Sequence, residues 1–181
     1  MTLKMKKETA RRWKYGVALT AVTVAAGVVQ VEFFGRLGLW AVPDLVFAAL
    51  MCVAFYCGKE TGAVMGLCAG VLVEALERAP GLHFLPVVYL LCGYVCGAAV
   101  RGRFTERSFL NYLCVVGVAI PVHEGIELAK IATRYGNIRV EHLVTRVLLP
   151  DAAALALSMV VLYLPLRQLC RWLKTPAIRP V

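Results

Sequence analysis

The most unusual polar residues of the chain interrupt an apolar stretch, in the segment His123-Glu124-Gly125-Ile126-Glu127. A histidine with two carboxylates offers the groups used in acid–base catalysis and in metal binding. His123 and Glu127 are four residues apart, so a helix would place them on one face, where we expect them to pair. The segment begins like the zinc-protease pattern His-Glu-x-x-His. Because Glu127 replaces the second histidine and no third ligand follows, we expect no metal or protease site.

The surroundings of this segment suggest a different role. A charged group at the centre of a membrane span costs about 2.5–3.5 kcal/mol on insertion scales, so such groups face protein or water. Pro121, just before the segment, is expected to bend the helix. The sequence therefore predicts a satisfied polar cluster near the outer end of a span, with a functional contact or a cavity as the alternative.

Two Pro-Asp pairs, Pro43-Asp44 and Pro150-Asp151, stand near the starts of apolar runs. Proline fits the first turn of a helix because its missing N–H would be unpaired there anyway. An adjacent aspartate complements the positive end of the helix. We interpret both aspartates as helix caps, and a polar contact with a partner is the alternative.

Glycine recurs at every fourth position in two apolar runs. Gly62, Gly66 and Gly70 form one series, and Gly93 and Gly97 form another. Such spacing places small residues on one helix face and allows close approach of a second helix. The pattern predicts tight packing inside the chain or, alternatively, a face for a partner's helix.

The sequence contains no P-loop, dinucleotide-binding fingerprint, Gly-x-Ser-x-Gly elbow or Cys-x-x-Cys pair. Six of the seven cysteines lie in or beside apolar segments, where thiols behave as small hydrophobic groups. We therefore expect no catalytic residues, no cofactor and no metal.

Composition indicates the class of protein and therefore the kind of elements that position these residues. Of the 181 residues, 60% are hydrophobic and 17% are charged, and the mean hydropathy is +0.73. A soluble domain carries roughly 45–50% apolar and about 25% charged residues. These values exclude a soluble globule and a disordered chain. The net charge of +9 resides between the apolar runs, so it indicates orientation in a bilayer rather than binding to nucleic acid.

The hydropathy pattern predicts an all-α polytopic membrane protein, a compact bundle of six transmembrane helices. A basic cytoplasmic arm (1–14) precedes the bundle (15–166), and a basic cytoplasmic tail (167–181) follows it. With both termini inside, 14 of the 20 basic residues are cytoplasmic, as the positive-inside rule favours. The predicted spans are Tyr15–Phe34, Leu39–Cys57, Gly62–Leu76, Leu82–Val100, Phe109–Ala132 and Val147–Leu166.

The sequence resembles MreD, the small integral membrane component of the bacterial rod-shape machinery. The resemblance is clearest from about Pro43 to Arg103, roughly a third of the chain. Glu74 stands where the family usually has aspartate. The pattern consists of Pro43, Asp44, Gly62, Gly66, Glu74, Gly81, Tyr89, Gly93, Tyr94 and Gly97.

The resemblance implies a non-enzymatic protein of the cytoplasmic membrane that binds the single-span protein MreC. Through that complex it would act with the filament protein MreB, the glycosyltransferase RodA and a class B penicillin-binding protein in lateral peptidoglycan synthesis. The glycine faces, including Gly66 and Gly70, are expected to hold the partner's helix.

Two other functions remain open from the residues. The substrate-binding subunits of energy-coupling-factor vitamin transporters also have six spans and this size, and the MreD fold is thought to resemble theirs. The small-residue run from Ala21 to Ala25 matches the spacing with which those subunits dock their coupling protein. A membrane enzyme built around His123 and Glu127 is the third possibility.

Overall fold

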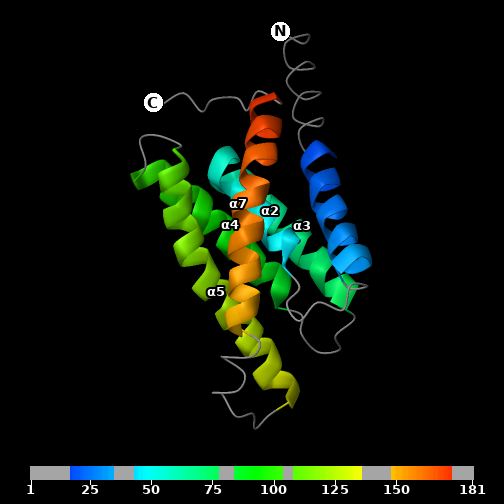
Figure 1. The fold of residues 1–181 in the computed structure, drawn as a ribbon. Helices are drawn as coiled ribbons and strands as arrows, with labels where there is room; N and C mark the ends of the chain where they lie inside the picture. Colours follow the sequence, from blue (N-terminus) through cyan, green and yellow to red (C-terminus); the bar gives the residue numbers. More distant parts are fainter. Residues whose placement is uncertain (1–16, 35–42, 78–83, 104–107, 136–147, 173–181) are drawn as a thin grey trace.

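A computed structural model describes residues 17–34, 43–77, 84–103, 108–135 and 148–172. The part of the chain within these ranges forms six helices and no strand (Figure 1). An N-terminal helix covers residues 17–34 and ends in a π-helical turn, η1. The labelled elements are η1 (Val29–Phe34), α2 (Leu45–Cys57), α3 (Lys59–Glu77), α4 (Leu85–Arg103), α5 (Phe109–Tyr135) and α7 (Leu149–Trp172).

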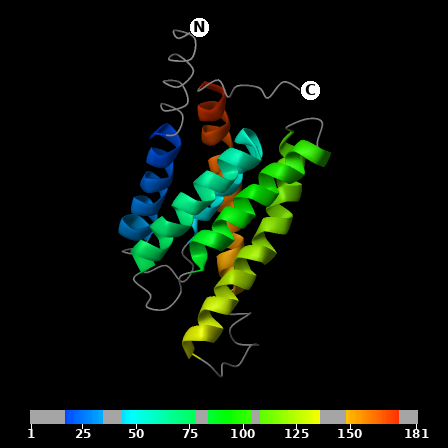
Figure 2. The same cartoon turned by 180° about the vertical axis from the view of Figure 1, so that it is seen from behind.

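Helix α2 is the centre of the molecule. Every one of its residues after Leu45 is buried, as expected for a helix that is apolar on all sides. It lies between α7 on one side and the α3–α4 pair on the other, as the front and back views show together (Figures 1 and 2). The other helices therefore form a single layer of cover around one short buried helix.

The closest helix pair is α3 with α4, and glycines make this contact possible. Gly62 lies against the backbone of Gly93, and Gly66 lies against the backbone of Tyr89. Gly70 continues the same face of α3. A Cβ atom at any of these glycines would overlap backbone atoms of α4, so only a residue without a side chain fits. This glycine face is occupied inside the chain, which leaves no room there for a partner's helix.

Successive helices begin and end at opposite ends of the bundle. At one end the thiols of Cys57 and Cys170 are 3.8 Å apart, so the C-terminal ends of α2 and α7 meet there. The start of α5 joins them, because the ring of Phe109 is 5.0 Å from that of Tyr163. We call this the basic end, since Lys59 at the start of α3 also lies there.

The outer surface of the bundle is strongly apolar. The exposed side chains include Val64, Leu110, Val118, Leu149 and Leu157, each at least 65% exposed. Many exposed large apolar side chains on α3, α5 and α7 are typical of a surface that contacts a membrane or another protein.

Two of the described helices are long and apolar enough to cross a membrane, over Phe109–Ala132 and Leu149–Arg171. Only 33% of the first stretch and 28% of the second is buried inside the protein, unlike the core helix of a soluble domain. Shorter apolar helices cover Val17–Glu32, Leu45–Cys57 and Leu85–Val100. The described part of the chain is thus all-α and includes two helices that are long and apolar enough to cross a membrane.

Several helix bounds differ from the predicted spans. Helix α3 begins at Lys59, so most of the predicted link before Gly62 is helical. Helix α4 ends at Arg103 instead of Val100, and helix α5 contains Pro121 and continues to Tyr135, beyond the predicted end at Ala132. Helix α7 continues to Trp172, which makes Arg167 and Arg171 helical although they were assigned to the tail.

Candidate functional site: a buried polar junction at the start of α2

The start of α2 is buried, so its free backbone N–H groups need partners inside the protein. The side-chain oxygen Oε1 of Gln30, in η1, accepts hydrogen bonds from the N–H groups of Leu45 at 3.0 Å and Val46 at 3.4 Å. The N-terminal helix therefore caps α2 from outside. A helix that begins inside an apolar bundle is stable only when its first backbone N–H groups have hydrogen-bond partners.

Asp44 satisfies the next two groups. Its Oδ1 accepts a hydrogen bond from the N–H of Phe47 at 2.9 Å, and its backbone carbonyl accepts one from Ala48 at 3.0 Å. Asp44 is thus the N-cap of α2, and it is only 8% exposed. Its negative charge lies at the positive end of the helix dipole.

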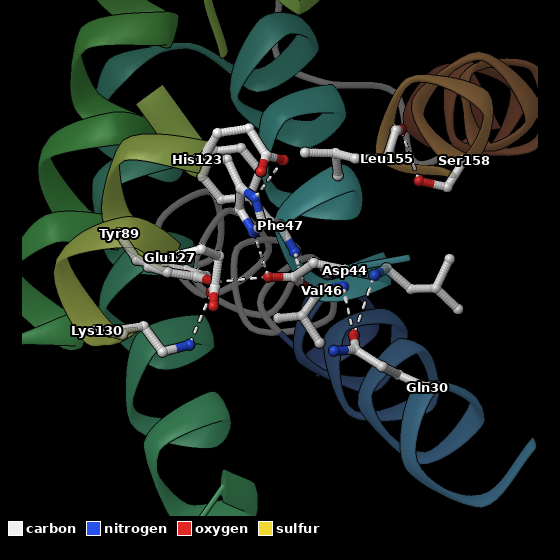
Figure 3. Close-up of polar contacts among 12 residues, drawn as sticks. Gln30, Asp44, Val46, Phe47, Tyr89, His123, Glu127, Lys130, Leu155 and Ser158 are labelled. Carbon is white, nitrogen blue, oxygen red and sulfur yellow. Dashed lines mark hydrogen bonds and ion pairs between the residues drawn. The ribbon is translucent and has the colours of Figure 1, made fainter. Parts of the chain in front are cut away.

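The second oxygen of Asp44 joins α2 to two other helices (Figure 3). Oδ2 accepts a hydrogen bond from the hydroxyl of Tyr89 on α4 at 2.7 Å and lies 3.1 Å from Nε2 of His123 on α5. The ring of Phe47 packs between them, 5.4 Å from the ring of Tyr89 and 4.8 Å from that of His123. We call Gln30, Asp44, Tyr89 and His123 the Asp44 junction.

The His123-to-Glu127 segment is arranged differently from the prediction. We expected His123 to pair with Glu127 along the helix. Instead His123 reaches across to Asp44, and Glu127 pairs with Lys130 at 2.7 Å. The reason is that burying Asp44 requires a donor from a neighbouring helix, and His123 is the donor that faces it.

Glu124 forms the far side of the junction. Its Oε1 lies 3.6 Å from Nδ1 of His123, so the imidazole stands between two carboxylates, Asp44 and Glu124. Neither oxygen of Glu124 has a hydrogen-bond partner in the structure. This carboxylate interacts with His123 through charge at a distance slightly beyond hydrogen bonding.

The polar groups of the junction connect α2 with α4 and α5. Within the described residues, no group of three His, Cys, Asp or Glu side chains is placed to hold a metal ion. All seven cysteines are free thiols. The donors and acceptors of Asp44, Tyr89 and Phe47 are used by one another. The arrangement therefore fits a structural junction of three helices.

The remaining predicted residues are not members of the Asp44 junction. Glu74 is half-buried near the end of α3, and Asp151 is half-buried in the first turn of α7. Tyr94 is exposed on α4 and has the amine of Lys59 above its ring at 5.9 Å. Gly97 lies against the backbone of Gly58 and Lys59. Pro43 is buried beside Asp44, and Gly81 lies outside the described residues.

The sequence prediction missed two polar residues that join helices, Gln30 and Tyr112. Gln30 had a signal, because it is the single amide in the apolar run that precedes Glu32. Tyr112 is fully buried and donates a hydrogen bond to the carbonyl of Met159 at 3.1 Å, which joins α5 to α7. Nothing local distinguishes Tyr112 from a tyrosine at the membrane interface.

Comparison of the chain with protein-family models, curated proteins and solved structures gives no match.

Proposed function

We propose that this chain is a multi-pass protein of the bacterial cytoplasmic membrane with six spans. The apolar exterior and the two long apolar helices support the membrane location. The alternation of helix ends supports the six crossings, because every described helix joins one end of the bundle to the other. The basic end faces the cytoplasm, as the excess of basic residues there favours.

Within that membrane, the chain is a non-enzymatic component of the cell-elongation machinery, similar to MreD. One observation supports this most directly: residues that carry the MreD resemblance meet in space. Asp44 bonds to Tyr89, Gly66 packs on the backbone of Tyr89, and Gly62 packs on Gly93. A pattern that arose by chance in an apolar sequence would have no reason to form one connected contact between α2, α3 and α4.

This contact gives the pattern a physical role. Lipid tails are as apolar as leucine, so helix packing in a membrane depends on close backbone contact and on buried hydrogen bonds. The glycines allow the close backbone contact, and the Asp44 junction provides the buried hydrogen bonds. The resulting bundle is a rigid scaffold that holds a single-span, MreC-like partner on its outer surface. The partner's helix binds a face other than that of Gly62, Gly66 and Gly70.

The test is affinity purification of the tagged chain from native membranes in mild detergent, followed by mass spectrometry. We expect an MreC-like single-span protein together with RodA or a class B penicillin-binding protein. A tagged, unrelated six-span protein from the same membranes is the matched control for non-specific capture.

Depletion of the chain in its native host gives an independent readout. Rod-shaped cells are expected to become round, and expression of the wild-type chain is expected to restore them. Recovery of two ATPase subunits with a multispan coupling protein, and unchanged shape on depletion, would overturn the proposal in favour of vitamin uptake.

A further inference from the structure

A half-buried cation, for which the described residues supply no carboxylate partner, lies at the basic end of the bundle. Arg167 is half-buried in the last third of α7, and its guanidinium carbon is 5.8 Å from the centre of the Tyr163 ring. Its Nε is buried and has no hydrogen-bond partner. Among the described residues, no carboxylate lies within salt-bridge distance of this guanidinium. A half-buried guanidinium with an unpartnered Nε favours an anion that comes from outside this part of the chain.

Two buried tyrosines lie near Arg167: the guanidinium is over the ring of Tyr163, and Tyr56 packs against Tyr163. The rings of Tyr56 and Tyr163 are 5.8 Å apart, and both side chains are at least 95% buried. Neither hydroxyl has a hydrogen-bond partner in the structure. Guanidinium and hydroxyl groups together offer several donors, and a phosphate, with its acceptor oxygens, is the ligand that such a set favours.

The surroundings indicate where that phosphate comes from. Arg171 is exposed one helical turn beyond Arg167, and from Arg167 to the end the sequence has four basic and no acidic residues. Toward the middle of α7, the exposed side chains Val161 and Leu164 are apolar. Positive charge at the helix end beside an apolar helix surface matches a phospholipid, with its headgroup at Arg167 and its acyl chains along α7.

We propose that Arg167 is the centre of a binding site for the phosphate of an anionic phospholipid, with the hydroxyls of Tyr56 and Tyr163 beside it. The site depends on the membrane location and is independent of the role in cell elongation. Occupation would hold the C-terminal ends of α2 and α7 together at the membrane surface.

The test compares the purified full chain in nanodiscs of phosphatidylglycerol and of phosphatidylcholine. Wild type is expected to unfold at a higher temperature in phosphatidylglycerol, and native mass spectrometry is expected to show retained phosphatidylglycerol. Arg167→Gln should bind this lipid about fivefold more weakly and lose most of the temperature difference. Arg171→Gln removes an exposed charge one turn away and is the matched control. It should keep most of the difference in unfolding temperature between the two lipids.

Two further measurements, one on the Arg167→Lys variant and one with inorganic phosphate, make the outcome decisive. Arg167→Lys keeps the charge without the planar fork and should retain part of the lipid effect, even if Arg167→Gln folds poorly. Equal stabilities in both lipids, or equal losses in the Arg167→Gln and Arg171→Gln variants, would overturn the site. Equal stabilisation by inorganic phosphate in detergent would show that it takes free phosphate and would overturn its assignment to a lipid.

Discussion

At the scale of single residues, Asp44 has two tasks that are usually separate. One oxygen caps α2 through Phe47, and the other receives Tyr89 and His123. A buried carboxylate is costly unless it is hydrogen-bonded, and here three partners from three helices contact its oxygens. Asp44 therefore sets both the start of α2 and the position of that start against α4 and α5.

Replacement of Asp44 by asparagine tests this role. Asparagine keeps the size and the cap but removes the charge, so the bond with His123 is weakened and one amide hydrogen faces Tyr89. We expect the free energy of unfolding to fall by about 2–3 kcal/mol, measured by equilibrium unfolding in mixed micelles. Tyr89→Phe removes one hydrogen bond only and should cost about 1 kcal/mol. A variant at Asp44 as stable as wild type would show that the junction does not stabilise the fold.

The pairing of Asp44 with His123 makes a second prediction. If the two side chains stabilise each other directly, the loss from Asp44→Asn and His123→Gln together should be smaller than the sum of the single losses. We expect a coupling energy of about 1–3 kcal/mol in the double-mutant cycle. Glu127→Gln with Asp44→Asn serves as the control pair, because Glu127 is bonded to Lys130 instead. Strictly additive losses for Asp44 and His123 would contradict the contact.

At the scale of elements, the close packing of α3 against α4 depends on glycine, whereas the glycines of α5 have open space where a side chain would be. A Cβ atom at Gly66 would overlap the backbone of Tyr89, but one at Gly117 or Gly125 would meet no atom within 4 Å. The same residue type therefore has opposite consequences on different helices.

Alanine substitutions make this difference measurable. Gly66→Ala forces the α3 and α4 backbones apart and should cost about 1–3 kcal/mol of stability. Gly117→Ala fills open space and replaces a poor helix former, so its stability should equal or slightly exceed that of wild type. Melting temperatures of the purified variants in detergent compare the two directly. Equal losses at both positions would show that the close α3–α4 contact is not formed.

At the scale of the whole molecule, the arrangement of helix ends places Lys59, Arg167 and Arg171 at one end and the Asp44 junction at the other. Under the positive-inside rule, the proposed orientation places the end with Lys59, Arg167 and Arg171 in the cytoplasm. Glu60 at the start of α3 and Ala132 near the end of α5 are exposed at opposite ends, so they report on orientation.

Labelling of introduced cysteines from outside the cell tests the orientation. A membrane-impermeant thiol reagent should modify the Ala132→Cys variant in intact spheroplasts and should modify the Glu60→Cys variant only after permeabilisation. Wild type is the control for labelling of its own exposed cysteines, which are Cys68 in the middle of α3 and Cys114 in the second turn of α5. The reverse labelling pattern would invert the proposed topology.

Local sequence patterns predicted much of the fold. Hydropathy indicated a chain of apolar helices, and the described residues form helices with short connections between them. Fourth-residue glycine spacing indicated a close helix contact, and Pro-Asp indicated the cap at Asp44. These features depend on neighbours within one or two helical turns, so the sequence alone is sufficient to show them.

Only the tertiary structure decided which helices meet. Asp44 finds Tyr89 and His123 at distances of 45 and 79 residues along the chain, and Gln30 caps a helix to which it does not belong. The glycine face of α3 turned out to serve α4, and Arg167 turned out to be a half-buried helical residue. Apolar helices have no strong preference for one apolar neighbour over another, so shape and a few long-range hydrogen bonds select the packing. The local sequence therefore does not show which helices such polar residues join.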